Sequence, residues 1–393
     1  MVLYSNAWAC VPDSYVCIRR KNMNDLLQNV PEVLLMGPGP SSVPREVYEA
    51  LGTSTLGHLD PYFITIMDET KMLLRRVMKT KNPLTFPISG TGSAGMEACL
   101  VNLIERGDPV LVLINGVFGG RMAEIARRLG AEVDTMEFPW GTPVDPEQAE
   151  KQLSKKAYKI VSVVHAETST GVRNPVKEIG SMLKSRDTLY VVDAVTSLGG
   201  MEVSCDGWGA DALYSGTQKC LSCPPGLAPV SFSERALAAV AKRETEVPNW
   251  YLDVGMIKSY WEGQKRAYHH TAPINMIYAL YMALGLVLSE GLENVFARHR
   301  KNHEYLVNGL KEIGIEMFVE PGFRLPMLNA VRVPDGVDEG SVRRKLREDH
   351  LIEIGAGLGP LAGKIWRIGL MGHTARPENV DRLLDAMRKV LGR

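Results

Sequence analysis

The sequence lacks several features by which large classes of protein are recognised. Its 393 residues include 45 Lys and Arg against 45 Asp and Glu, so the formal net charge is zero and no basic block stands out. This balance argues against nucleic acid or an acidic membrane surface as a partner. No apolar run is long enough to span a bilayer. We therefore expect a small-molecule ligand, held by local charges in a pocket.

Cysteine is also scarce, with six residues in the whole chain. That number predicts no disulfide framework and fits a reducing cytoplasm. Cys220 and Cys223 form one C-x-x-C motif without a second pair, so we expect buried thiols rather than a zinc site, with a redox role as the alternative. The N-terminus does not resemble a signal peptide, and the C-terminal VLGR is no peroxisomal signal. Residues 1–22 are expected to be a disordered extension or to precede the true start.

What the sequence does contain is an ordinary globular composition, with 45% hydrophobic and 23% charged residues. The chain is too long for one ordinary core, which predicts a large domain and a smaller one. Between residues 84 and 232, short runs of Val, Leu and Ile alternate with helical stretches. The predicted strands are 110–114, 159–165, 189–195 and 211–217, and the predicted helices include 120–130 and 175–185. This alternation is typical of an α/β fold with a mostly parallel, doubly wound sheet, whose ligands bind beyond the carboxyl ends of the strands.

Beyond residue 274 the pattern changes to a long helical stretch that reaches residue 314 and contains a glycine midway, which should end or kink the helix. Further short elements follow: predicted strands at 315–320, 329–334, 351–357 and 365–372, and predicted helices at 340–349 and 379–391. They predict a compact α/β appendage. We therefore divide the chain into an N-terminal extension (1–32), a large domain (33–290) and a small C-terminal domain (291–393).

Two charged residues lie at the ends of predicted strands. Lys219 follows the strand at 211–217, where partial desolvation favours a reactive neutral amine; taken alone, it would be a solvated surface lysine. Asp193 follows a Val-Val pair near the end of an apolar strand, where a carboxylate is costly to bury without a partner; a capping aspartate is the alternative. Together they meet two needs of pyridoxal 5′-phosphate (PLP): an amine for a Schiff base and an acid for the pyridine nitrogen.

A loop rich in glycine and hydroxyl groups, SGTGSAG at residues 89–95, precedes a predicted helix. Its amides and the hydroxyls of Thr91 and Ser93 could hold a phosphate at the helix N-terminus, with an ordinary helix cap as the alternative. The loop is not a P-loop, because no lysine follows, and no dinucleotide-binding unit surrounds it. Phe118 opens another predicted helix and could lie on a ring face, although such a residue is more often part of the core.

Arg367 lies in a short apolar strand and needs a partner there; a substrate α-carboxylate and an internal ion pair are about equally good candidates. A second unusual cluster is Tyr268-His269-His270-Thr271. Adjacent histidines point in different directions and no third ligand is evident, so no metal site is predicted. The hydroxyls of Tyr268 and Thr271 could instead bind a phosphate.

Taken together, these motifs resemble the class V aminotransferases of fold type I, and within them the alanine–glyoxylate and serine–pyruvate branch. The resemblance runs from about residue 34 to the C-terminus. It rests on the density and order of LLMGPGPSSVP, NPLTFPISGTGSAGMEA, HAETSTGV, VVDAVTSLGG, ALYSGTQK, NWYLDV, YHHTAPIN, RLP and WRIGLMG. It implies a large PLP-binding domain with a mostly parallel sheet and a smaller C-terminal α/β domain.

The resemblance also implies a role for each site residue. Lys219 would carry PLP as a Schiff base, and Asp193 would pair with its pyridine nitrogen. The other implied cofactor contacts are Thr91, Gly92 and Ser93 for the phosphate, Thr168 and Gln218 for the ring substituents, and Val195 and Phe118 for the two ring faces. Arg367 would bind the substrate carboxylate, and the loop Gly37–Pro40, which includes Gly39, would close the pocket.

Tyr268 and Thr271 would reach the phosphate bound by a neighbouring subunit, so the resemblance implies a two-fold homodimer with shared sites. The implied reaction is a ping-pong transfer of an amino group from L-alanine or L-serine to glyoxylate, which gives glycine and pyruvate or hydroxypyruvate. Relatives also use 3-hydroxykynurenine or ureidoglycine, and Phe118 and the segment 56–63 are expected to bear on this choice. The alternatives are a PLP lyase or cysteine desulfurase, which needs a mobile reactive cysteine, and a non-catalytic binding protein.

Overall fold

A computed structural model describes residues 23–393 with the exception of residue 264. The chain divides into two compact units, Met1–Val33 and Leu34–Arg393. Of the first unit, the structure describes helix α1 (Met23–Gln28) and the residues that follow it. The extension predicted for residues 1–22 lies outside the described residues.

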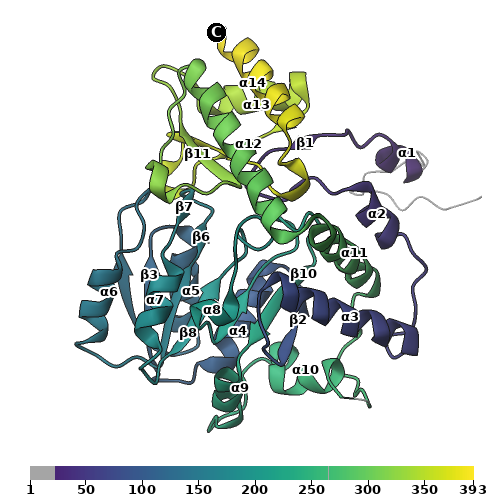
Figure 1. The fold of residues 1–393 in the computed structure, drawn as a ribbon, viewed down its shortest axis with the longest axis vertical. Helices are drawn as coiled ribbons and strands as arrows, with labels where there is room; N and C mark the ends of the chain where they lie inside the picture. Colours follow the sequence, from purple (N-terminus) through teal and green to yellow (C-terminus); the bar gives the residue numbers. More distant parts are fainter. Residues whose placement is uncertain (1–22, 264) are drawn as a thin grey trace, which may run out of the picture. The chain divides into compact units, whose positions relative to one another are not determined.

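The second unit contains a seven-stranded sheet, seen in the lower half of Figure 1. In spatial order its strands are β2 (Leu84–Ser89), β10 (Leu227–Phe232), β9 (Ala212–Tyr214), β8 (Leu189–Asp193), β5 (Ile160–Val164), β3 (Pro109–Ile114) and β4 (Glu132–Glu137). Of these strands, β10 runs antiparallel to the other six, which are parallel to one another. Strands β5, β8, β9 and β10 are buried along their whole length, as expected of mostly apolar runs. The predicted mostly parallel α/β sheet is confirmed.

Helices lie between the strands of this sheet and around it. Their bounds are α2 (Arg45–Leu51), α3 (Pro61–Val77), α4 (Gly92–Leu103), α5 (Val117–Arg128), α6 (Pro146–Leu153), α7 (Val176–Leu183), α8 (Cys205–Trp208), α9 (Glu234–Ala241) and α10 (Val254–Trp261). Helices α4 and α5 directly follow β2 and β3, so their N-termini lie at the carboxyl ends of those strands. Because helix N-termini attract anions, this edge of the sheet suits a negatively charged ligand.

Two helices, α11 (Ile274–Glu290) and α12 (Leu292–Glu312), form the long helical stretch of the sequence. They meet at an angle of 83° at Gly291, whose φ of +86° favours glycine. The expected break at a glycine is confirmed. Among the described residues, no single helix has the length and apolar character to cross a membrane; by length and composition alone, only the bent pair α11 and α12 does.

The C-terminal part contains a second sheet, in which β14 (Ile365–Gly369) lies between β11 (Leu328–Arg332) and β13 (Gly355–Ala356). Helices α13 (Glu339–His350) and α14 (Pro377–Leu391) lie with α12 and β11 at the top of Figure 1. The strand predicted at 315–320 is wrong. Those residues make only a bridge between Met317 and Val331, with two flanking backbone hydrogen bonds, before the chain turns away.

The main apolar clusters follow the two sheets. One large cluster surrounds the seven-stranded sheet, and a second cluster lies in the C-terminal part. Met36 belongs to the second cluster, and the short strand β1 (Leu34–Leu35) pairs with β12 (Ile352–Glu353) of the C-terminal part. The glycine-containing loop Gly37–Pro40 therefore leaves the C-terminal part and leads toward the large sheet. The boundary placed at residues 290 and 291 stays a prediction.

Candidate active site

A cavity of about 170 Å³ opens where β5 and β8 end at Val164 and Asp193. Its lining residues are Thr91, Gly92, Ser93, Met96, Phe118, Arg121, Val164, Thr168, Asp193, Val195, Gln218 and Lys219. All of these except Met96, Arg121 and Val164 are residues that the sequence singled out. The predicted positions that do not line this cavity are Gly39, Tyr268, Thr271, Arg367 and the segment 56–63.

Lys219 lies on a tight loop after β9 and is only 9% exposed, so it is not a solvated surface lysine. The loop is held by Ser41, whose hydroxyl donates to the Lys219 carbonyl over 2.7 Å and whose amide donates to the Gln218 carbonyl over 2.9 Å. The Lys219 amine donates to the carbonyl of Pro38. Burial, together with the positive charge of Arg367, lowers the pKa of Lys219 to about 8. A nucleophilic neutral amine is therefore accessible near neutral pH.

The loop Gly37–Pro40 lies directly against this amine. Gly39 has a φ of +107°, and a Cβ built on it would lie 2.6 Å from Lys219 Nζ. A side chain at this position would be strained and would also displace the lysine. The loop thus lies beside the lysine amine, and its closing over a substrate stays a prediction.

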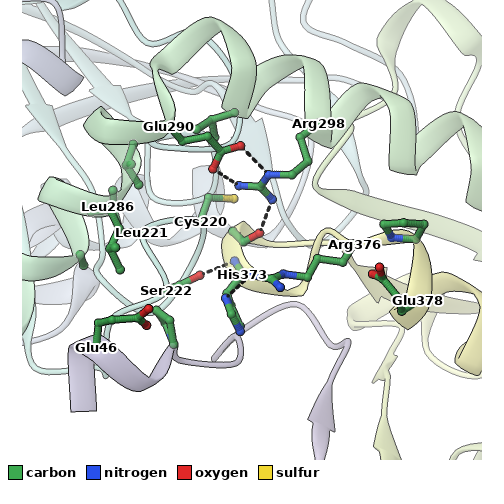
Figure 2. A pocket seen from close by; sticks show the side chains of 16 residues that line it. Glu46, Cys220, Leu221, Ser222, Leu286, Glu290, Arg298, His373, Arg376 and Glu378 are labelled. Atoms are coloured by element: carbon green, nitrogen blue, oxygen red, sulfur yellow. Dashed lines mark hydrogen bonds and ion pairs between the residues drawn. The ribbon is translucent and has the colours of Figure 1, made fainter. Parts of the chain in front are cut away.

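A second cavity, of about 480 Å³, is lined by the residues that follow the lysine, 220–222 (Figure 2). The Ser222 hydroxyl accepts a hydrogen bond from the His373 amide over 2.7 Å. Nearby, Arg298 donates to the Gly372 carbonyl over 2.7 Å. A Cβ on Gly372 would lie 2.1 Å from the Ser222 hydroxyl, so the two segments are in close contact. Figure 2 thus shows how the C-terminal part supports the loop that carries Lys219.

Asp193 is the last residue of β8 and is 2% exposed. Its Oδ1 accepts a hydrogen bond from the Val195 amide over 2.8 Å, and its Oδ2 accepts one from the Tyr214 hydroxyl over 2.7 Å. Burial raises the pKa of Asp193 to about 7, against the effect of both hydrogen bonds. A carboxylate buried in this way is stabilised by a cationic group in the cavity.

The N-terminus of α4 forms another wall of the cavity. Thr91 makes no side-chain capping bond, so the first amides of the helix are available to an anion. Gly92 approaches Val195 so closely that a Cβ on the glycine would lie 3.3 Å from a valine methyl group. Gln218 Oε1 is buried with no hydrogen-bond partner among the described residues. These free polar groups are ones that a bound ligand would satisfy.

Glu167, which the sequence reasoning missed, joins two walls of the cavity. Its fully buried carboxylate accepts from the amides of Phe118 (3.2 Å) and Gly119 (3.4 Å) at the start of α5. The other oxygen accepts from the Ser169 amide (3.1 Å) and hydroxyl (2.6 Å). A carboxylate at a helix N-terminus is stabilising, and this one ties Phe118 to the segment that contains Thr168. The centroid of the Phe118 ring in turn lies 5.0 Å from the guanidinium carbon of Arg121, also on α5.

Arg367, on β14, is 7% exposed. Its Nε donates to the Ala356 carbonyl over 2.6 Å, and one terminal nitrogen donates to the Thr168 carbonyl over 3.3 Å. No direct salt bridge between described residues involves Arg367, but the negative charge of the buried Glu167 acts on its pKa, so the substrate carboxylate and the internal ion pair both stay predictions. Burial lowers the pKa of Arg367 to about 10, which leaves it charged at neutral pH. The positive charge of Arg367 lowers the pKa of Lys219, which means that the two groups are near each other. Their proximity is consistent with a carboxylate site next to the amine.

Tyr268 and Thr271 lie on the surface, where their hydroxyls are 3.3 Å apart and Tyr268 is 58% exposed. The histidines between them are engaged elsewhere. His269 stacks on Trp250 with ring centroids 4.3 Å apart, and Nε2 of His270 is 2.9 Å from a serine hydroxyl. No group of three or more metal-binding side chains occurs among the described residues.

A desolvated amine and a buried carboxylate facing one small cavity at the end of a parallel sheet define a catalytic site rather than a docking surface. The family model for class V aminotransferases matches residues 36–383, and the chain belongs to this family of fold type I enzymes. The predicted family and enzyme class are confirmed.

Individual relatives agree over most of the chain. The (S)-ureidoglycine–glyoxylate transaminase of Bacillus subtilis is 42% identical over 375 residues, which cover 91% of this chain and 90% of the relative. The alanine–glyoxylate aminotransferase of Callithrix jacchus is 41% identical over 366 residues, with coverage of 92% and 88%. Among solved structures, the alanine–glyoxylate aminotransferase of Nostoc sp. superimposes with a TM-score of 0.91 at 49% identity, with coverage of 92% and 96%.

Proposed function

We propose that this aminotransferase uses PLP to transfer the amino group of L-alanine or L-serine to glyoxylate, which gives glycine and pyruvate or hydroxypyruvate. The observation that carries the proposal is that Lys219 and Asp193 line the same 170 Å³ cavity beside an uncapped helix N-terminus. Glyoxylate as the amino acceptor is supported by the names of the three relatives described above, each of which is named for it.

The cavity residues fit PLP. Asp193 offers a buried carboxylate to the protonated ring nitrogen, and Lys219 offers a neutral amine to the aldehyde. The N-terminal amides of α4, from Thr91 to Ser93, offer donors to the phosphate. When bound, the cofactor supplies an electron sink for the negative charge that develops at the substrate Cα.

Each neighbouring side chain then has a definite task. Nε and one terminal nitrogen of Arg367 donate to backbone carbonyls. The guanidinium binds the substrate carboxylate with its remaining N–H groups, and thereby orients Cα. The neutral Lys219 amine accepts the proton from Cα, and its low pKa keeps it available for that step. Phe118 and Val195 line the cavity and would restrain the ring of a bound cofactor, and Glu167 holds the start of the helix that carries Phe118.

The nature of the cysteines supports a transaminase over a cysteine desulfurase. The four described cysteines are free and buried. Burial raises the pKa of Cys220 and of Cys223 to about 12, so neither is a thiolate at neutral pH. A second candidate donor is (S)-ureidoglycine, because the Bacillus subtilis relative is named for that substrate. 3-Hydroxykynurenine remains a further candidate on the sequence resemblance alone.

A homodimer with shared sites is part of the proposal. Trp250, Tyr251 and Tyr268 are 57%, 41% and 58% exposed, which is unusual for aromatic side chains and supports a partner surface there. If Tyr268 and Thr271 serve the phosphate of the partner's site, a Lys219→Ala chain co-expressed with a Thr271→Ala chain should regain part of the activity that each homodimer lacks. No recovery in a mixed dimer would contradict shared sites.

The activity itself is tested with glyoxylate and a panel of donors: L-alanine, L-serine, (S)-ureidoglycine and 3-hydroxykynurenine. We expect glycine to form with L-alanine or L-serine, and to be absent with Lys219→Ala. The matched control is Lys71→Ala, which removes a lysine equally buried but bonded to the Trp261 carbonyl outside the cavity. Glycine formation only with ureidoglycine would replace the proposed donor, and no glycine with any donor would refute the reaction.

A further inference from the structure

Tyr214 has a buried hydroxyl whose hydrogen bond is made to Asp193. It is the last residue of β9, and the parallel register of β8 and β9 places it directly beside Asp193. Side chains paired in this way project from the same face of the sheet, so the tyrosine hydroxyl reaches Asp193 Oδ2 over 2.7 Å. Tyr214 does not line the cavity, and its hydroxyl reaches the cavity through Asp193.

The space for the tyrosine comes from α4. A Cβ on Gly95 would lie 3.1 Å from the Tyr214 Cβ and 3.0 Å from the Ala228 Cβ, so glycine lets the helix lie this close to the sheet without displacing either side chain. The tyrosine ring is thereby enclosed and fully buried. Its hydroxyl has a single acceptor among the described residues, the Asp193 carboxylate, and is held toward it.

The charged and titratable groups around Asp193 act in different directions. Burial and the negative charge of Glu167 raise the pKa of Asp193, whereas the Tyr214 hydroxyl and the charge of Lys219 lower it. Cys99 on α4 also lies near, but burial raises its pKa so far that it stays neutral. The pKa of Tyr214 is likewise raised well above its ordinary value, first by burial, so its hydroxyl remains a donor at every working pH.

We propose that Tyr214 is a positioning residue that keeps Asp193 ionised and correctly oriented for the protonated ring nitrogen of the cofactor. The inference rests on the proposed function, since it assumes that Asp193 meets such a nitrogen. With the amide of Val195 on Oδ1 and Tyr214 on Oδ2, the carboxylate cannot rotate, and each oxygen keeps a lone pair for a further donor. A hydrogen bond to a charged group is worth roughly ten- to a hundredfold in an equilibrium constant. This is the upper limit of the loss in affinity, because the bond is also present without the ligand.

The test compares Tyr214→Phe with Tyr190→Phe. Tyr190 is also a fully buried tyrosine of the same sheet, but its hydroxyl donates to the Val176 carbonyl over 2.9 Å, away from the cavity. The measurement is the affinity of cofactor-free protein for pyridoxamine 5′-phosphate from pH 5.5 to 8.5. This ligand has the ring nitrogen and phosphate but no aldehyde, so the covalent link to Lys219 does not contribute.

We expect Tyr190→Phe to bind like the wild type, and Tyr214→Phe to bind more weakly, by up to roughly a hundredfold. Binding is lost as the pH falls through the pKa of Asp193, and without the hydroxyl that pKa is higher, so the loss should begin at a higher pH in Tyr214→Phe. In the Asp193→Asn background, Tyr214→Phe should have no further effect.

The outcomes separate the two claims. If the wild type binds neither pyridoxal 5′-phosphate nor pyridoxamine 5′-phosphate, the proposed function is wrong. If the wild type binds and Tyr214→Phe matches Tyr190→Phe in affinity and pH profile, the inference about Tyr214 is overturned. A loss that persists in full in the Asp193→Asn background would assign the effect to folding and would also overturn it.

Discussion

Replacing Arg367 by lysine tests whether this residue binds the substrate carboxylate. Lysine keeps the positive charge but cannot present two parallel donors, so one charge-assisted hydrogen bond to the substrate should be lost. At about 1.5–3 kcal/mol for such a bond, kcat/KM should fall roughly ten- to a hundredfold. Because the carboxylate is bound alike before and during the reaction, most of the loss should appear in KM rather than in kcat.

The assay is steady-state kinetics with L-alanine and glyoxylate varied separately. Both substrates carry a carboxylate next to the reacting carbon, so KM should rise for both. Arg332→Lys is the matched control, because Arg332 lies on β11 in the same small sheet with its guanidinium 5.2 Å from the Phe318 ring centroid. Unchanged KM values for both substrates in Arg367→Lys, or an equal rise in the control, would refute the assignment.

Three other predictions follow from the lysine and its surroundings. Gly39→Ala should reduce the fraction of protein loaded with PLP, measured by absorbance after dialysis, because its Cβ would lie 2.6 Å from Lys219 Nζ; full loading would contradict the packing. Glu167→Gln should lower the free energy of unfolding of cofactor-free protein by about 1–3 kcal/mol in denaturant titrations, because a neutral amide cannot accept four hydrogen bonds; wild-type stability would contradict this. Since the folded pKa of Lys219 is about 8 and its ordinary value is 10.5, the folded state binds fewer protons between these values, so stability relative to Lys219→Met should rise from pH 8 to 10.5; a flat difference would place the lysine in solvent.

The sheet was predictable because strands buried on both faces need mostly apolar sequence, and β3, β5 and β8 have it. The strand predicted at 315–320 is wrong because pairing with a neighbour, not sequence, decides whether a strand forms there. That segment has strand-like residues, but its backbone makes only a few bonds to β11, and whether a partner strand is available is a tertiary matter that local pattern does not reveal.

The site residues also fall into two groups: those that a local sequence pattern predicts and those that it does not. Lys219, Asp193 and the loop at 89–95 carry a local signal, because polar or glycine residues interrupt apolar strands where a parallel sheet places its ligands. Tyr214 and Glu167 carry none. Tyr214 is 21 residues from Asp193 in sequence, and Glu167 is 49 residues from Phe118. The order of strands in the sheet brings these partners together. From sequence alone, Tyr214 and Glu167 are therefore indistinguishable from ordinary buried residues.

The central claim is tested most directly by the visible spectrum of the purified protein loaded with PLP. Addition of L-alanine or L-serine without an acceptor should abolish the yellow absorbance and release pyruvate or hydroxypyruvate in an amount equal to the active sites. Addition of glyoxylate should then restore the absorbance and produce an equal amount of glycine. A protein that stays colourless after incubation with PLP, or whose colour neither donor alters, would contradict the account of Lys219 and its cavity.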